Sequence, residues 1–397
     1  MKIARITDLH ADAGWRTFSF LKVETADGLA GWSEYNEGYG SAGLTAVIRR
    51  LGEGLIGGDP RAVEALSARL RAQTVAAPGG INQQAIAALE NALVDLKARA
   101  LGIPVYELLG GPIRRRFRLY WSHCGTYLLD PAIADLIGQP AIRTPDDLTA
   151  LGARVRAAGY DAMKTNIFLF DGPDGAPRLH MPGFGRTPGG PEVNADRPVI
   201  AALREQLAAL RAGAGDEADI LLDLNFNFRP EGYRRVMRAL DDLGLFWFEL
   251  DNYDAAAMAE IRRRTGTPLA SCESLYHRRQ YRPFLEANAV DVAIVDVPWN
   301  GILESLKIAA LCDTYEVNCA PHNFYGPLST LMSAHFCAAI PNFRIMETDP
   351  DDVPWKNDLV TVPPRVADGH LHLPDGPGWG AEVNEAAIRA HPAKTAL

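Results

Sequence analysis

Short apolar runs recur along the second half of the chain, and each carries a polar residue at or near its end. The runs are ILLDLN, LFWFEL, PLASCE, DVAIVD, EVNCAPH and NFRIME, and their polar residues are Asp223, Glu249, Glu273, Asp296, His322 and Glu347. Successive members of this series lie 23 to 26 residues apart. That interval holds one strand, one helix and two loops, which is the βα unit of a parallel barrel. Because the carboxyl ends of barrel strands open on one face, the pattern predicts that these side chains converge.

The same pattern extends upstream and predicts an eight-stranded barrel. Its strands are expected at residues 117–122, 160–166, 220–225, 245–249, 268–273, 291–296, 316–322 and 342–347. After the second strand, residues 170–193 are rich in Gly and Pro. A loop of this length at the carboxyl end of a strand is usually functional. We interpret it as a lid insertion.

The N-terminal part has a different pattern, which indicates an α+β unit. KIARI, TFSFLKVET and LAGWSEY are strand-like, and a polar loop from His10 to Arg16 is expected between the first two. Helical patterns cover residues 41–75, and a long helix starts near Asn82 and stops at Gly102. The predicted organisation is an α+β capping domain at 1–115, a barrel at 116–350, and a C-terminal segment at 351–397 that returns to the capping domain.

Composition narrows the functional classes. The 397 residues are 47% hydrophobic, enough for a large core, and the net charge of −9 argues against a nucleic-acid surface. The chain has no run of 18 apolar residues and no signal-peptide core, so we expect a cytoplasmic protein with no membrane contact. The five cysteines form no CxxC pair and are odd in number. This favours buried free thiols over disulfides or a zinc site.

Three of the converging side chains are carboxylates on consecutive strands. Strand ends are often acidic for a structural reason, since Asp and Glu cap the helices that follow. Six polar residues in phase, with a histidine among them, are harder to explain in this way. Ligation by oxygen alone suits Mg²⁺ or Mn²⁺ rather than zinc. Asp223, Glu249 and Glu273 are therefore candidate ligands of a divalent cation that leaves positions open for a substrate carboxylate.

His322 is the candidate general base. Asp296, one strand earlier, could hydrogen-bond the far ring nitrogen and fix the tautomer. An isolated histidine is more often structural, but the phase with Asp296 favours catalysis. Lys164, at another strand end, could neutralise an enolate from the opposite side, or could be a surface lysine. Glu347 could hydrogen-bond the substrate carboxylate or enolate oxygen if its site keeps it protonated, or could only support its neighbours.

Residues 17–34 (TFSFLKVETADGLAGWSE), 85–111 and 319–328 (CAPHNFYGPL) carry a resemblance that extends over nearly the whole chain. They resemble the enolase superfamily, in particular the acid-sugar dehydratases of its mandelate racemase subgroup, such as galactonate dehydratase. The resemblance implies a modified TIM barrel, (β/α)7β, with an α+β capping domain formed by the N-terminus and the C-terminal tail. It also implies one Mg²⁺ per subunit, held by Asp223, Glu249 and Glu273, an Asp296–His322 base dyad, and Glu347 as a hydrogen-bond donor.

Two departures from the family pattern bear on the reaction. The family racemases carry Lys-x-Lys on the second strand, whereas this chain has Lys164-Thr165-Asn166. Asn166 cannot abstract a proton, which argues against two-base racemisation. Galactonate dehydratase shares Lys-x-Asn but has an acidic His two residues after the first metal ligand, where this chain has Asn225. The general acid is then protonated His322 or His123. A further departure is that Leu250-Asp251 follows Glu249.

The leading hypothesis is a Mg²⁺-dependent dehydratase that converts an acid sugar with one or two carboxylates to a 2-keto-3-deoxy product. Alternatives are an epimerase, racemase or lactone cycloisomerase of the same superfamily, a barrel glycosidase with Glu249 and Glu273 as its carboxylate pair, and a sugar-acid binder without turnover. We expect a homo-oligomer, from dimer to octamer. The residues expected to contact the substrate are Trp15, Arg16, His123, Asn166 and Asn225.

Overall fold

The computed structural model describes residues 1–397 except 39–40, 173–174, 186–191 and 395–397. The chain begins with an antiparallel sheet in the order β1-β2-β3, formed by β1 (Ile3–Asp12), β2 (Thr17–Thr25) and β3 (Ala30–Tyr35). Strand β1 pairs with β2 as far as Asp12 opposite Thr17. The predicted loop starting at His10 therefore begins only after Asp12, because its first residues continue the β ladder.

Three helices follow the N-terminal sheet: α1 (Leu44–Glu53), α2 (Val63–Gln73) and α3 (Gly80–Leu101). Helix α3 is buried along most of its 22 residues and ends at Gly102, which has the left-handed conformation. It packs closely on β3 at Gly31, where an added Cβ would lie 2.3 Å from the carbonyl oxygen of Ala92. The prediction of a long helix that stops at Gly102 is confirmed.

Eight parallel strands form the barrel. They are β4 (Arg116–Trp121), β5 (Ala162–Thr165), β8 (Asp219–Asp223), β9 (Trp247–Glu249), β10 (Leu269–Ser271), β11 (Val292–Val295), β12 (Asn318–Pro321) and β13 (Met346–Thr348). Neighbours pair in the order β4-β5-β8-β9-β10-β11-β12, and β13 pairs with β4. A parallel bridge between Cys319 and Phe343 joins the last two strands. The predicted eight strands are confirmed, and most are shorter than predicted.

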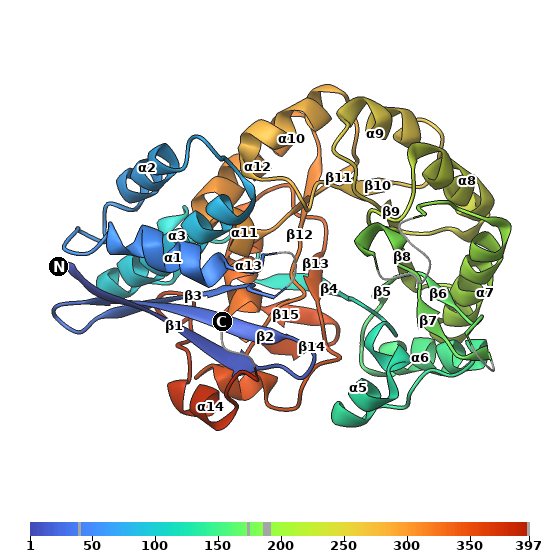
Figure 1. Ribbon diagram of the computed structural model, residues 1–397, viewed down its shortest axis with the longest axis horizontal. Coiled ribbons are helices and arrows are strands. Elements are labelled where there is room, and N and C mark those ends of the chain that lie inside the picture. Colours follow the sequence, from blue (N-terminus) through green and yellow to red (C-terminus); the bar gives the residue numbers. More distant parts are fainter. Residues whose placement is uncertain (39–40, 173–174, 186–191, 395–397) are drawn as a thin grey trace.

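Helices connect the strands on the outside of the barrel. They are α5 (Pro131–Leu136), α6 (Pro145–Ala157), α7 (Arg197–Ala214), α8 (Pro230–Leu240), α9 (Ala255–Arg262), α10 (His277–Glu286), α11 (Val297–Asn300), α12 (Ile302–Thr314) and α13 (Pro327–Ala339). The short helix α4 (Val105–Leu108) lies between α3 and β4. Figure 1 shows the strands in the middle, an arc of helices from α6 to α10 around them, and the blue N-terminal sheet at one side. Within the described residues, no helix is long and apolar enough to cross a membrane.

The barrel interior is filled by side chains from successive strands. This inner cluster consists of Tyr120, Ala162, Leu221, Trp247, Ala270, Val292, Ile294, Ala320 and Ile345, all buried. The rings of Tyr120 and Trp247 meet edge to face, with centroids 5.8 Å apart. A filled interior closes one end of the barrel and leaves the carboxyl ends of the strands as the open face.

The C-terminal tail contacts both parts of the molecule. Strands β14 (Arg365–Ala367) and β15 (His370–His372) form a hairpin whose second strand pairs antiparallel with β4. Further on, the Trp379 indole donates to the carbonyl of Trp32 at 2.7 Å. Helix α14 (Glu385–Ala390) ends near β1, where Pro392 bridges to Ala11. The fold is thus the predicted modified barrel with an α+β cap. The exact domain boundaries stay predictions.

The long connection after β5 contains a small antiparallel pair, β6 (Phe168–Leu169) and β7 (Arg178–Leu179), followed by a 3₁₀ turn at Pro182–Phe184. Part of the predicted lid, residues 173–174 and 186–191, lies outside the described residues, so the lid stays a prediction. The five cysteines are buried and free, as predicted.

Candidate active site

Lys164 lies at the centre of an acidic cluster on the open face of the barrel. Its Nζ is 2.7 Å from Glu249 Oε1, 3.1 Å from Glu347 Oε1 and 3.5 Å from Asp223 Oδ2. The four side chains come from β5, β9, β13 and β8, and the strand period predicted the convergence of Glu249, Glu347 and Asp223. All are buried, with Lys164 only 3% exposed. One ammonium group is therefore surrounded by three carboxylates without much water to screen them.

His322 and Asp296 form a hydrogen-bonded pair at the ends of β12 and β11. His322 Nδ1 is 2.6 Å from Asp296 Oδ2, and Nε2 is 3.7 Å from Glu273 Oε2. A carboxylate beside Nδ1 favours the tautomer in which Nδ1 carries the proton, so Nε2 is the nitrogen left for chemistry. Burial alone would lower the pKa of His322, but the negative charges of Glu273, Glu347 and Asp296 raise the pKa to about 10.

Two further groups hold Asp296 in place. The Tyr325 hydroxyl donates to Asp296 Oδ2 at 2.5 Å, and the Trp299 backbone N–H donates to Oδ1 at 2.7 Å. Sequence reasoning did not single out Tyr325. It lies three residues after His322 in the irregular segment between β12 and α13, where no periodic pattern indicates a side chain's direction.

Glu347 accepts hydrogen bonds on both oxygens. Ser122 Oγ donates to Oε1 at 2.5 Å and the Asn323 backbone N–H donates to Oε2 at 2.6 Å. Burial would raise the pKa of Glu347, but the charges of Lys164, His322 and His123 lower it to about 2. In this structure Glu347 is an ionised acceptor. Its predicted role as a donor to substrate stays a prediction.

The remaining acids lie close together, which is electrostatically unfavourable, and Glu249 and Asp251 are buried while Glu273 is partly buried. Burial raises the pKa of Glu249 to about 8, with Asp223 and Glu273 adding to the rise and Lys164 opposing it. Burial also raises the pKa of Glu273. Asp251, 6% exposed, has its pKa raised well above the usual range by burial and by Glu273, Asp223 and Glu249. The sequence showed Asp251 only as a departure from the family pattern. Asp251 lies beyond the end of β9, so the alternation of side chains along a strand does not predict its direction.

The donor set fits a hard divalent cation. Burial and neighbouring acids raise the pKa of Glu249 and of Glu273 beside Asp223. A cation stabilises such a group of carboxylates, and oxygen ligands suit Mg²⁺ or Mn²⁺. In the conformation shown, no three His, Cys, Asp or Glu side chains of the described residues converge tightly enough to hold a metal ion. The Lys164 ammonium lies between Glu249 and Asp223. Cation binding would thus require these side chains to turn from the lysine toward a common point.

Two asparagines extend the Lys164 side of the site. Asn166 Nδ2 donates to Asn225 Oδ1 at 3.2 Å, and Thr126 Oγ1 donates to Asn166 Oδ1 at 2.8 Å. The Asn225 backbone N–H donates to Asp223 Oδ1 at 2.9 Å. Both asparagines are buried. They offer amide groups for a substrate hydroxyl, but neither is an acid or a base.

The predicted capping residues meet beside the barrel mouth. The Trp15 ring is 4.6 Å from that of Tyr127, which stacks on His123 at 5.2 Å. Phe324 lies 5.7 Å from His123 and 5.1 Å from His322, so it connects this aromatic group to the base. Trp15 and His123 therefore lie in one aromatic group beside the site, and their contact with substrate stays a prediction. Tyr127 is a neighbour that the sequence did not reveal.

Arg16 has partners within the protein. Its guanidinium donates to Asp352 Oδ2 at 2.5 Å and to the carbonyl of Phe324 at 2.5 Å, and it lies 3.5 Å from Asp349 Oδ2. Asp352 is 336 residues away in sequence. Arg16 thus fastens the capping loop to the segment after β13. Contact with substrate, predicted from the sequence, would require it to release one of these groups.

Two family models match the chain. The mandelate racemase/muconate lactonizing enzyme N-terminal domain matches residues 10–110, and the enolase C-terminal domain-like family matches residues 147–387. The chain belongs to the enolase superfamily, in its mandelate racemase subgroup. The resemblance carried by residues 17–34, 85–111 and 319–328 is therefore confirmed.

Several proteins similar to this chain are named dehydratases. A D-xylonate dehydratase from Haloferax volcanii is 30% identical over 98% of this chain and 89% of its own length. A D-gluconate dehydratase from Thermoproteus tenax is 28% identical over 96% of this chain and 71% of its own length. A crystal structure from Burkholderia xenovorans strain LB400, provisionally named an L-alanine-DL-glutamate epimerase and bound to magnesium and fumarate, is 46% identical. Its TM-score is 0.95, with 99% of this chain and 97% of that chain covered.

Proposed function

We propose that the protein is a divalent-cation-dependent dehydratase of acid sugars. The proposal rests on a difference between the two sides of the site, because only one side has a side chain arranged as a general base. His322 presents one ring nitrogen toward the acidic cluster and is backed by Asp296. Opposite it, Lys164 is engaged by Glu249 and Glu347. One base is sufficient for elimination of water, whereas racemisation needs an acid or base on each side.

The residues present divide the work of the reaction. Asp223, Glu249 and Glu273 would hold Mg²⁺ or Mn²⁺, which when bound supplies positive charge to the substrate carboxylate. His322 Nε2 takes the proton α to the carboxylate, while Asp296 stabilises the imidazolium that forms. The Lys164 ammonium offsets negative charge that develops on the carboxylate oxygens.

Elimination completes the reaction. The electron pair of the broken Cα–H bond forms a Cα–Cβ double bond as the Cβ–O bond breaks. The hydroxyl leaves as water after taking a proton from His322 or from His123. The resulting enol takes up a proton at Cβ and loses the proton of its hydroxyl, which gives a 2-keto-3-deoxy acid. His322 can serve as both base and acid if the proton and the hydroxyl leave from the same face of the substrate.

The relatives support the proposal at the level of reaction class. Two named dehydratases act on sugar acids, D-xylonate and D-gluconate, and align with nearly the whole chain. The Burkholderia structure is bound to magnesium and to fumarate, a small carboxylate. We therefore propose Mg²⁺ as the resident ion and a small sugar acid as substrate. A cytoplasmic location and a homo-oligomeric assembly stay predictions.

The second candidate is an epimerase or racemase. It is favoured by the provisional name of the 46% identical structure and by the position of Lys164 across from His322. A lactone cycloisomerase would use the same proton abstraction. These reactions give no 2-keto product, which separates them from dehydration.

A screen against sugar acids with Mg²⁺ tests the proposal. The 2-keto-3-deoxy product is detected with semicarbazide, and each positive reaction is repeated with EDTA. We expect product from one or a few sugars, and loss of product in EDTA. Product that persists in EDTA would contradict the proposed role of the divalent cation. Absence of product with exchange of the α-proton in D₂O would favour the epimerase.

A further inference from the structure

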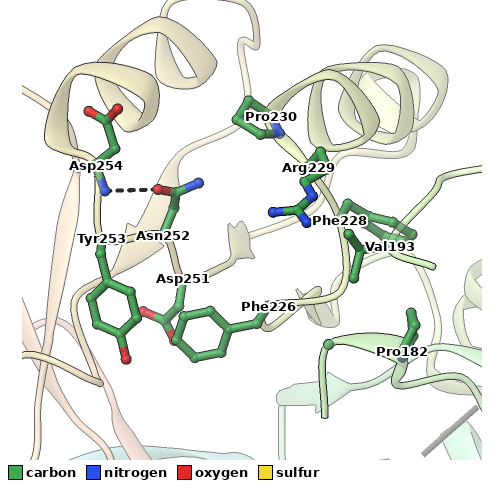
Figure 2. A pocket seen from close by; sticks show the side chains of 11 residues that line it. Pro182, Val193, Phe226, Phe228, Arg229, Pro230, Asp251, Asn252, Tyr253 and Asp254 are labelled. Carbon is green, nitrogen blue, oxygen red and sulfur yellow. Dashed lines mark hydrogen bonds between the residues drawn. The ribbon is translucent and has the colours of Figure 1, made fainter. Parts of the chain in front are cut away.

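A pocket of about 620 Å³ has Asp251 in its lining. It lies between the segment after β8 and the segment after β9, and Pro182, Gly183 and Val193 line its third side (Figure 2). The segments after β8 and β9 follow the carboxyl ends of barrel strands, so the pocket is on the same face as His322 and the acids. Its volume is within the range of a small-molecule site.

The pocket adjoins the candidate catalytic residues. Phe226 in its wall directly follows Asn225, and Asp251 at its inner end lies two residues beyond Glu249. The Asp251 backbone N–H donates to the carbonyl of Asn225 at 3.1 Å, which ties the two segments together. The pocket is thus built on the segments that follow β8 and β9, the two strands that end at Asp223 and Glu249 of the acidic cluster.

Arg229 provides a cation in the pocket. It precedes α8 and is exposed, and Figure 2 shows its guanidinium directed into the cavity. Within the described residues it makes no side-chain hydrogen bond or ion pair. Of the acids in the lining, Asp254 is already used, because its carboxylate accepts from the backbone N–H groups of Ala256 and Ala257 and caps α9.

Asn252 adds a neutral donor facing Arg229. Its Oδ1 accepts from the Asp254 backbone N–H at 2.8 Å. The amide nitrogen is therefore on the other side, and Figure 2 shows it directed toward Arg229 across the cavity. An amide N–H and a guanidinium on opposite walls form a pair of donors that suits an anion.

Aromatic side chains form the rest of the opening. The rings of Phe226 and Tyr253 are 5.5 Å apart, and Phe184 meets Phe226 edge to face at 6.0 Å. Tyr253 is 71% exposed although it borders the site. Flat apolar walls with a few polar groups are the usual composition of a small-molecule site.

We propose that this pocket binds the distal end of the substrate, and that Arg229 and Asn252 recognise a second anionic group there. The inference rests on the proposed function, because it places the reacting carboxylate at the acidic cluster. The substrate class is then a sugar acid with a negative charge at both ends. The second group is a carboxylate or a terminal phosphate, both of which a guanidinium binds through paired hydrogen bonds.

The contact is remote from the reacting carbon, which determines its kinetic signature. An interaction made equally in the ground state and in the transition state lowers KM and leaves kcat nearly unchanged. Loss of a charged hydrogen bond should therefore raise KM for the dianionic substrate by about ten- to a hundredfold. A merely structural role for Arg229 would lower kcat or stability for every substrate alike.

The test uses matched sugar acids of one configuration with Mg²⁺: the monocarboxylate, the dicarboxylate, and the monocarboxylate phosphorylated at its far end. Wild type is compared with Arg229→Gln, with Asn252→Asp, and with the control Arg235→Gln. Asn252→Asp keeps the oxygen that accepts from Asp254 but replaces the donor with a negative charge. Arg235 lies on α8 and pairs with Glu231 at 3.7 Å, outside the pocket.

We expect wild type to prefer a dianionic substrate. Arg229→Gln and Asn252→Asp should raise KM for that substrate about tenfold or more, with a much smaller change for the monocarboxylate and no change in Arg235→Gln. Whichever of the dicarboxylate and the phosphate is preferred identifies the second group. Equal losses for all three substrates, or a wild-type preference for the monocarboxylate, would overturn the proposal.

A binding measurement tests the pocket independently of the proposed dehydration. If no sugar acid is turned over, thermal shifts with Mg²⁺ and each of the three compounds are measured instead. A shift by the dianion that is larger in wild type than in Arg229→Gln would support the pocket while the proposed dehydration fails. Identical shifts in the two proteins would overturn the pocket itself.

Discussion

The two sides of the candidate active site differ in which atoms are left for chemistry. On the first side, His322 Nδ1 is bound to Asp296 at 2.6 Å, and Nε2 is directed toward Glu273 at 3.7 Å. The pairing fixes the ring and leaves one nitrogen for proton transfer. This side has the arrangement of a general base.

On the second side, the polar groups are engaged with each other. The Lys164 ammonium is within 3.1 Å of Glu249 and Glu347, and the amides of Asn166 and Asn225 bond at 3.2 Å. These groups supply charge and hydrogen bonds but no evident proton acceptor. Charged residues therefore lie on both sides of the site, but only the His322 side has a side chain arranged for proton transfer.

Metal removal should have the largest effect, since both sides share the same acidic cluster. Without a divalent cation, the charge of the substrate carboxylate would be repelled by Asp223, Glu249 and Glu273. We expect EDTA to reduce turnover to background, and added Mg²⁺ to restore it. Activity unaffected by EDTA would contradict the assignment of these three acids.

Replacing the base should come next. His322→Asn removes the proton acceptor and keeps a polar side chain of similar size, so we expect kcat to fall by about a thousandfold. Cation affinity should stay the same, because His322 is not among the proposed ligands. His372→Asn in β15 is the control and should keep wild-type kcat. Full activity in His322→Asn would show that another residue is the base.

Replacing the cation on the second side should cost less. Lys164→Met removes the ammonium that offsets developing charge, and we expect kcat to fall by about a hundredfold. The control is Lys307→Met on α12, where the lysine pairs with exposed Glu64. A loss equal to that of His322→Asn, together with loss of α-proton exchange, would indicate that Lys164 also transfers protons.

Tyr325→Phe should have the smallest effect and sharpens the description of the first side. The hydroxyl donates to Asp296 and stabilises its negative charge. Without it, Asp296 attracts the Nδ1 proton more strongly, so the pKa of His322 rises. Since the base must be deprotonated, the rise of kcat/KM with pH should move to higher pH by up to about one unit. A move to lower pH would contradict this role.

The sequence predicted the barrel and the ring of polar residues because both follow from one periodic signal. Parallel strands bring their carboxyl ends to one face, so the nearly constant spacing is enough to bring Asp223, Glu249 and Glu347 together. Lys164 lies outside that spacing and was placed through the strand predicted at residues 160–166. The predicted end of β1 was less accurate. Residues from His10 to Asp12 look like a polar loop in the sequence, but they continue the pairing with β2. Here backbone pairing overrides local polarity.

Other parts of the site depend on contacts that no local pattern encodes. Arg16 is held by Asp352 and Asp349, which are distant in sequence, so its direction follows from how the tail packs. Tyr325 and Asp251 lie in irregular segments just beyond strands, where side-chain direction is set by tertiary neighbours. Such residues could be placed only after the fold was known.

The most direct test of one-sided chemistry is the stereochemical fate of the α-proton. The protein is incubated with Mg²⁺ and a responsive sugar acid in D₂O, and both substrate and product are followed by NMR. We expect the 2-keto-3-deoxy product, and any deuterium in the remaining substrate to occur with retained configuration at the α-carbon, because only His322 exchanges the proton. Deuterated substrate with inverted configuration would show a second acid–base group opposite His322 and would contradict the account.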